Sequence, residues 1–296
     1  MESLNYANLE YVQSYRLQDL KIFNIQRKKQ LAYILQSDFN FLKAVKNHSN
    51  QFYQFTTSQT LKNGVSKSRE LEVPNKLLKC VHKRIGQLLS EIPAPEYLFS
   101  KKKSSCVLNA KAHAGCRGLT LNIDIRKFFP STSKFQVEQF FGYFLQYPRD
   151  IAQFMASICT VNDHIPTGSS LSLVLTYWTN KPMFDEMYKI SKARNIKMTV
   201  YVDDISFTGT KVNDNFKRKI EAIITKHGHR LSLDKIKFFG TQRKYINRIL
   251  IINGQLKPNS EISRDIRILK KDPNSGADVR LGKQNYVKYI EKVNQL

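Results

Sequence analysis

The clearest pattern along the chain is a strict alternation of apolar and polar residues over 119–126. The apolar positions are Leu119, Leu121, Ile123 and Ile125, and the polar positions are Thr120, Asn122, Asp124 and Arg126. A two-residue period is typical of a β-strand that has one face in the core and the other face open. We therefore expect a strand here, with Asp124 on its open face.

A second pair of strands is predicted over 196–208. Two apolar runs, 196–201 and 205–208, are joined by only a few residues, and the joint falls within the sequence Tyr-Val-Asp-Asp at 201–204. Runs of this length with so short a connection indicate a β-hairpin. Asp203 and Asp204 are then expected at the tip of that hairpin.

Helices and another hairpin are predicted around these strands. Apolar residues recur at helical spacing from Leu77 to Leu89, and again over 135–161, where Pro148 is expected to break the helix. The segments 51–57 and 68–74 indicate a hairpin that turns near 62–64 and is ended by Pro74. Residues 1–50 are expected to be helical and basic. This order favours an α+β fold with an antiparallel, ferredoxin-like sheet and helices on one face.

The charge of the chain narrows the class of partner. Its 48 Lys and Arg stand against 24 Asp and Glu, a formal charge of +24, which exceeds what solubility requires. Basic side chains that neutralise phosphates release counterions, so such a protein binds nucleic acid with a strong dependence on salt. A merely solvated basic surface, or an anionic membrane, is the alternative explanation of the charge.

Other features of the composition favour a soluble, cytoplasmic protein with no membrane partner. The first residues are acidic and polar, and no run approaches the roughly 18 apolar residues of a membrane span. The four cysteines form no Cys-x-x-Cys pair, which suits a reducing compartment and argues against a structural zinc site.

Three carboxylates stand out in so basic a chain. If neighbouring strands bring Asp124, Asp203 and Asp204 together, the three will repel one another unless a cation lies among them. Two Mg²⁺ ions about 4 Å apart could supply that charge, activate a 3′-hydroxyl and stabilise a leaving pyrophosphate. Paired aspartates at a turn can also be solvated turn residues, but the order of the surrounding features favours the metal site.

These motifs resemble those of the reverse transcriptase family. Its hallmark, a Tyr-x-Asp-Asp hairpin, matches 201–204, and its first palm motif is similar to the sequence NIDIRKFFPS at 122–131. The resemblance implies an RNA-directed DNA polymerase with a right-hand fold of fingers, palm and thumb. Its catalytic and metal-binding positions would be Asp124 with the adjacent Ile125, Asp203 and Asp204, with two Mg²⁺ ions as cofactors.

The resemblance also implies residues that bind the deoxynucleotide. These are Lys67 and Arg69 in a basic strand, Phe129 as the gate against ribose, Gly168 and Tyr201. The family's Pro-Gln-Gly is replaced by Pro-Thr-Gly at 166–168, which leaves open how the nucleotide is held. Lys237 matches a general-acid lysine, although Lys235 is only two residues away.

Within the family the chain is most similar to the bacterial retron branch. An Asn-Ala-x-x-His block supplies Asn109 and His113, which are expected to bind nucleic acid, whereas the branch's Val-Thr-Gly marker is replaced by Tyr-Ile-Asn at 245–247. Retron enzymes copy a cognate structured noncoding RNA into a branched RNA–DNA hybrid, msDNA, and act in anti-phage defence with an effector protein. The implied boundaries are an N-terminal region at 1–50, fingers at 51–117, palm at 118–250 and thumb at 251–296.

Two other functions stay open at this point. One is a defence reverse transcriptase of the abortive-infection kind, which makes DNA without a dedicated branched primer. The other is a non-catalytic scaffold that uses a polymerase fold only to hold RNA. The three aspartates argue against the scaffold, because it has no need to concentrate carboxylates in a basic protein.

Overall fold

The computed structural model describes residues 17–62, 65–100, 105–271 and 277–295. It divides into two compact units, and each is assembled from segments that are far apart in the sequence. Unit 1 comprises the described residues of Met1–Pro93, Arg126–Asp185 and Thr225–His229. Unit 2 comprises those of Ala94–Ile125, Glu186–Ile224 and Arg230–Leu296. The four contiguous regions expected from the sequence therefore stay a prediction.

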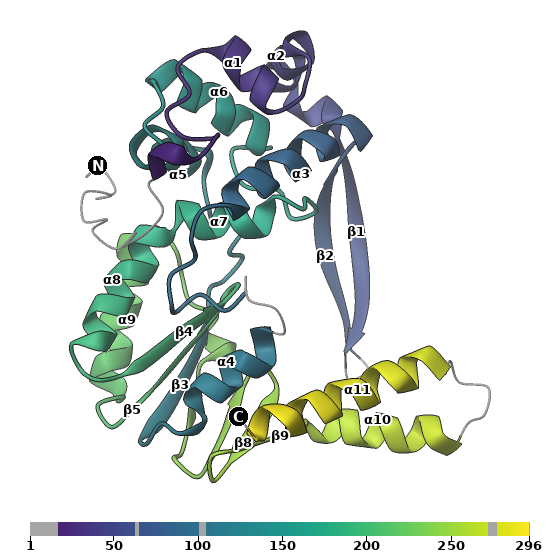
Figure 1. The fold of residues 1–296 in the computed structure, drawn as a ribbon, viewed down its shortest axis with the longest axis vertical. Coiled ribbons are helices and arrows are strands. Elements are labelled where there is room, and N and C mark those ends of the chain that lie inside the picture. The colour runs from purple at the N-terminus through teal and green to yellow at the C-terminus, as the bar shows by residue number, and fades with distance from the viewer. Residues whose placement is uncertain (1–16, 63–64, 101–104, 272–276, 296) are drawn as a thin grey trace. The chain divides into compact units, whose positions relative to one another are not determined.

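Unit 1 is a group of helices with one long hairpin (Figure 1). Its helices are α1 (Lys28–Ile34), α2 (Phe39–Asn47), α3 (Lys76–Ser90), α5 (Lys134–Gln139), α6 (Arg149–Cys159) and α7 (Ser172–Thr179), with shorter turns at η1 (Leu17–Asp19), η2 (Ser49–Phe52) and η3 (Phe140–Phe144). The hairpin pairs β1 (Tyr53–Lys62) with β2 (Val65–Pro74) in antiparallel register, as expected. Residues 63 and 64 of its predicted turn lie outside the described residues.

Local sequence explains where the helices of unit 1 begin. Asn75 caps α3 by accepting a hydrogen bond from the backbone N–H of Leu78, and Ser133 caps α5 in the same way with Gln136. The expected break near Pro148 is confirmed, because α6 begins directly after it. The apolar face predicted for 77–89 is buried in α3 except at Leu77, which is exposed.

Unit 2 contains two antiparallel sheets. The first has the order β4–β5–β3–β6 and is built from β3 (Leu119–Asp124), β4 (Lys197–Tyr201), β5 (Asp204–Gly209) and β6 (Lys237–Phe239). The helix α9 (Asp214–Lys226), whose last residues lie in unit 1, covers β5 through an edge-to-face contact between Phe216 and Phe207. The helix α8 (Lys181–Lys192) likewise begins in unit 1 and ends in unit 2.

The second sheet of unit 2 packs against two helices from distant parts of the chain. It consists of β7 (Arg243–Ile246), β8 (Ile249–Ile252) and β9 (Gln255–Lys257), and it lies beside α4 (Ser105–Ala114) and α11 (Ala277–Asn294) (Figure 1). Their shared core includes Val107, Ala110, Ile249, Ile251 and Ile290. The helix α10 (Ser260–Lys271) runs alongside α11. The expected mixture of helices and antiparallel sheet is thus confirmed, and the fold is α+β.

Among the described residues, none of the helices combines the length and apolar character that crossing a bilayer requires.

Candidate metal centre

The three aspartates meet at one end of the β4–β5–β3–β6 sheet. Strands β4 and β5 pair so that Tyr201 lies opposite Asp204, which leaves Val202 and Asp203 in the turn between them. Asp124 lies opposite Asp204 on the neighbouring strand, and the backbone N–H of Ile125 donates to the carbonyl of Asp203 at 3.2 Å. The pairing of β5 with both β3 and β4 therefore brings the predicted hairpin tip next to the end of the predicted strand.

The turn itself has an unusual backbone. Val202 has a φ of 61°, in the left-handed region, where β-branched residues are rare and strained. The strands on both sides, which are buried over most of their length, must hold this conformation in place. A strained residue between Tyr201 and Asp203 is consistent with a site whose carboxylates need fixed positions.

The carboxylates are close enough to share a cation. One carboxylate oxygen each from Asp124, Asp203 and Asp204 lies within 4.8 Å of the others, and the residues are buried, half-buried and exposed in that order. The pKa of Asp204 is raised to about 6, firstly by partial removal of its carboxyl group from water and secondly by repulsion from Asp203 and Asp124. A divalent cation would relieve this repulsion.

The alternation over 119–126 predicts that Asp124 lies on an open face, but the structure buries it. It is only 5% exposed, because the segment after α9 folds over it. The Ser232 hydroxyl donates to Oδ1 and the Lys235 ammonium donates to Oδ2, each at 2.6 Å. These two partners were not anticipated, since a hydroxyl and a lysine in a basic chain give no distinctive signal.

The lysine that contacts Asp124 is not the one that the resemblance matches to the general acid. Lys237 lies on β6 opposite Asn122 and is exposed, whereas Lys235, on the short turn η4 (Leu233–Lys235), forms the ion pair with Asp124. The role of Lys237 as the general acid stays a prediction. The geometry gives the contact with the carboxylate cluster to Lys235.

The expected nucleotide-binding residues of unit 1 lie around strand β2 and the start of α5. Arg69 is exposed on β2, and Phe129 is half-buried beside Phe128, with ring centroids 6.3 Å apart. The backbone of Lys67 belongs to β2, but its side chain lies outside the described part of the structure.

Gly168 lies directly against strand β2. A Cβ at this position would lie 2.8 Å from the carbonyl oxygen of Glu72, and the Gly168 N–H donates to that oxygen at 3.2 Å. Beside it, the Thr167 hydroxyl donates to the Glu70 carbonyl at 2.9 Å and accepts from the Glu72 N–H at 3.2 Å. Gly168 thus allows the loop to lie against β2, and Thr167 adds two side-chain hydrogen bonds to the backbone of that strand.

The two residues of the Asn-Ala-x-x-His block are buried in unit 2. His113 has no exposed surface and forms hydrogen bonds with the hydroxyls of Thr208 at 2.7 Å and Thr199 at 2.8 Å. Asn109, only 1% exposed, donates to the side chain of Asn247. Direct contact with nucleic acid, which the resemblance had implied, does not fit this burial. Instead, the block fixes α4 to β4, β5 and the β7–β8 turn.

Two curated proteins that match the chain in sequence are both retron reverse transcriptases. No protein-family model matches the chain. The chain is 27% identical over 203 residues to the Retron Se72 reverse transcriptase of Salmonella heidelberg (strain 579083-10), which covers 65% of this chain and 51% of that protein. It is 24% identical over 156 residues to the Retron Ec48 reverse transcriptase of Escherichia coli, covering 51% of this chain and 38% of that protein. The chain thus spans about half or less of the length of these curated relatives.

The fold has a counterpart among solved structures. Apo telomerase from Candida Tropicalis, truncated from its C-terminal domain, superposes with a TM-score of 0.50 at 10% identity, over 71% of this chain and 55% of that one. This likeness concerns the fold alone. The two sequence relatives confirm the resemblance that the motifs indicate, because both of these homologues are retron reverse transcriptases.

Proposed function

We propose that the chain is an RNA-directed DNA polymerase that copies a structured noncoding RNA into DNA. The observation that carries this proposal is the convergence of Asp124, Asp203 and Asp204 at one end of a sheet, in a chain whose sequence relatives are retron reverse transcriptases. Two Mg²⁺ ions held there would activate the primer hydroxyl and neutralise charge on the leaving pyrophosphate. Asp124, the Ile125 backbone, Asp203 and Asp204 would hold them.

Other residues act on the nucleotide in this proposal. Arg69 and Lys67 bind the triphosphate, for which the planar fork of arginine is well suited. Phe129 excludes the ribose 2′-hydroxyl, and Tyr201, directly before the turn, lies under the nucleotide. Residues 51–117 form fingers, 118–250 a palm and 251–296 a thumb.

The partners that we propose are those implied by the resemblance to retron enzymes. The RNA serves as template and primer, deoxynucleotides are the substrates, and the product is a branched RNA–DNA hybrid, msDNA. We propose that the protein acts in the bacterial cytoplasm, in anti-phage defence, together with an effector protein. The formal charge of +24 supports the nucleic-acid part of this proposal.

One experiment tests the reaction and its retron character together. The protein is expressed with its native flanking DNA and purified, and the bound nucleic acid is run on a denaturing gel with and without RNase. We expect DNA of fixed length attached to an RNase-sensitive RNA, and its absence in Asp203→Asn. Asp214→Asn, at an exposed carboxylate at the start of α9, is the matched control and should retain the product.

The other outcomes separate the rival functions. DNA without attached RNA would favour a defence enzyme of the abortive-infection kind. RNA alone, from both wild type and Asp203→Asn, would favour a scaffold. If Asp203→Asn retains full Mg²⁺-dependent incorporation of deoxynucleotides, the metal assignment is wrong.

A further inference from the structure

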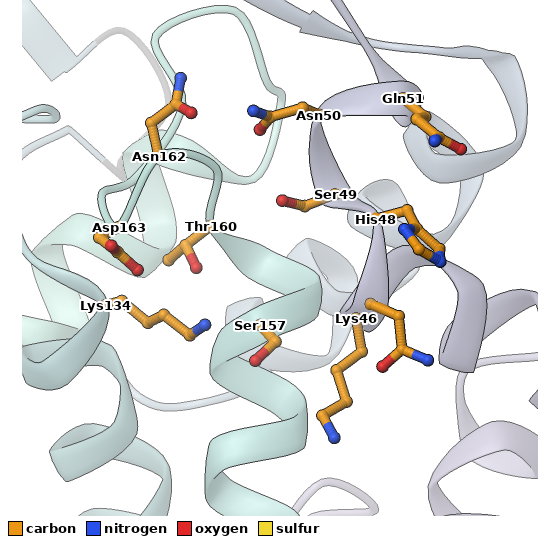
Figure 2. A pocket seen from close by; sticks show the side chains of 11 residues that line it. Lys46, His48, Ser49, Asn50, Gln51, Lys134, Ser157, Thr160, Asn162 and Asp163 are labelled. Carbon is orange, nitrogen blue, oxygen red and sulfur yellow. The ribbon is translucent and has the colours of Figure 1, made fainter.

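Unit 1 contains a polar pocket of about 420 Å³ that none of the assignments above uses (Figure 2). One wall is 46–51, at the end of α2 and in η2, and the other is formed by Lys134, Ser157, Thr160, Asn162 and Asp163. Every lining residue is polar or charged. Because sites for drug-like or apolar ligands are lined mainly by hydrophobic side chains, this pocket is suited to a ligand that is itself polar.

The second wall is held rigidly. The segment 161–164 is a tight turn in which Val161 and His164 exchange two backbone hydrogen bonds of 3.0 Å, with Asn162 and Asp163 at positive φ. Asparagine and aspartate tolerate this backbone better than most residues. The N–H of Lys134 donates to the Asp163 carbonyl at 2.8 Å, so the start of α5 is tied to the turn. The wall is therefore formed before any ligand binds.

The charges in the pocket favour an anion. Lys46 and Lys134 line it with one carboxylate, Asp163. Of the ion pairs found in the described part of the chain, none involves either ammonium. Two lysines on opposite walls therefore have charge available for a phosphate group.

The buried hydroxyls of the pocket can accept hydrogen bonds from a ligand. Ser157 donates its proton to the Gln153 carbonyl at 2.8 Å, and Thr160 donates to the Ala156 carbonyl at 2.7 Å. Each hydroxyl has a single proton, so only its lone pairs remain for a ligand. Both residues are more than nine-tenths buried, and Figure 2 shows both side chains on the wall that carries Lys134.

A ribonucleotide matches both the lysines and the hydroxyls. Its phosphate accepts from the lysines, and its 2′-hydroxyl donates to Ser157 or Thr160, whereas a deoxyribonucleotide lacks that donor. We propose that the polar pocket binds one nucleotide of single-stranded RNA and distinguishes it from DNA. The site is separate from the carboxylate cluster and concerns retention of RNA, not polymerisation.

The test measures binding without any polymerase reaction. All variants carry Asp203→Asn and are studied in EDTA, by fluorescence anisotropy with a labelled single-stranded RNA and with DNA of the same sequence. We expect Lys134→Gln to weaken RNA binding about fivefold and to reduce the slope of log K against log salt by about 0.7, the value for one phosphate contact on a single strand. Lys43→Gln, an exposed lysine on α2 that does not line the pocket, is the matched control and should have a smaller effect.

The hydroxyl contacts have their own test. Ser157→Ala should weaken RNA binding about threefold and leave DNA binding unchanged, a difference of about 0.7 kcal/mol. Thermal unfolding of each variant checks that the fold is intact, and Thr160→Val provides a second variant if Ser157→Ala is unstable. Equal effects of Lys43→Gln and Lys134→Gln, or equal effects of Ser157→Ala on RNA and DNA, would overturn the proposal. Neither result would bear on the polymerase assignment.

Discussion

Lys235 should compete with metal for the carboxylate of Asp124. Its ammonium lies 2.6 Å from Oδ2, and its side chain is 50% exposed while that of Asp124 is 6% exposed. A cation that binds through Oδ2 must displace this ammonium. Removing the competitor in Lys235→Ala should therefore strengthen metal binding.

The size of the effect follows from the exposure of the pair. Exposed ion pairs contribute about 0.2–1 kcal/mol, and hydrogen bonds to charged groups contribute about 1.5–3 kcal/mol. Because one partner of this pair is half-exposed, its contribution should lie between the two ranges, at about 1 kcal/mol. Since 1.4 kcal/mol is tenfold in an equilibrium constant, we expect the dissociation constant for Mn²⁺ to fall about fivefold.

The assay is a titration with Mn²⁺ at pH 7.5 in the absence of nucleotide, with free Mn²⁺ measured by electron paramagnetic resonance. Lys237→Ala is the control, because it removes the same charge from an exposed position on β6. The advantage of Lys235→Ala over this control should shrink at high salt, since half of the pair is open to solvent. Unchanged or weaker binding in Lys235→Ala, or equal strengthening in Lys237→Ala, would refute the reasoning.

Three further predictions concern the rest of the chain. Burial lowers the pKa of His82 to about 4. At pH values below its unfolded pKa of about 6.5, the unfolded chain therefore binds a proton that the folded chain does not. The free energy of unfolding should fall by roughly 1 kcal/mol between pH 7.5 and 5.5 through this residue. In His82→Gln that part of the pH dependence should disappear from urea unfolding curves, and an unchanged slope would contradict the assignment. Gly168→Ala should lower the free energy of unfolding by about 1–3 kcal/mol because its Cβ would meet the Glu72 carbonyl. The control Gly115→Ala should be near neutral, since no atom lies within 4 Å of its Cβ. Equal effects of the two substitutions would exclude the clash. Phe129→Ala should raise incorporation of ribonucleotides relative to deoxynucleotides in single-nucleotide extension, and an unchanged ratio would mean that another residue is the gate.

The sequence predicted those parts of the site that depend on local periodicity. The strand over 119–126 and the hairpin tip at Asp203 and Asp204 follow from a two-residue period and a short connection, and antiparallel pairing then brings Asp124 opposite Asp204. The break at Pro148 was equally local, because proline has no N–H to donate within a helix.

Other features depended on contacts between distant segments. Nothing near Asp124 in the sequence indicates that Ser232 and Lys235 cover it, since they are more than 100 residues away. His113 likewise gave no sign that two threonines of the sheet would satisfy its ring and bury it. The two units could not be predicted from contiguous patterns, because each is assembled from three separate segments.

The pairing of Thr167 and Gly168 with β2 also bears on how the protein behaves at high concentration. A two-stranded hairpin leaves backbone groups along its outer edges that can pair with another chain and begin aggregation. The loop occupies the carbonyl of Glu70 and both the N–H and the carbonyl of Glu72, so these three backbone groups of β2 are not available to another chain. Thr167→Val, which removes the side chain's hydrogen bonds at nearly the same volume, would therefore expose a strand edge and promote self-association through β2.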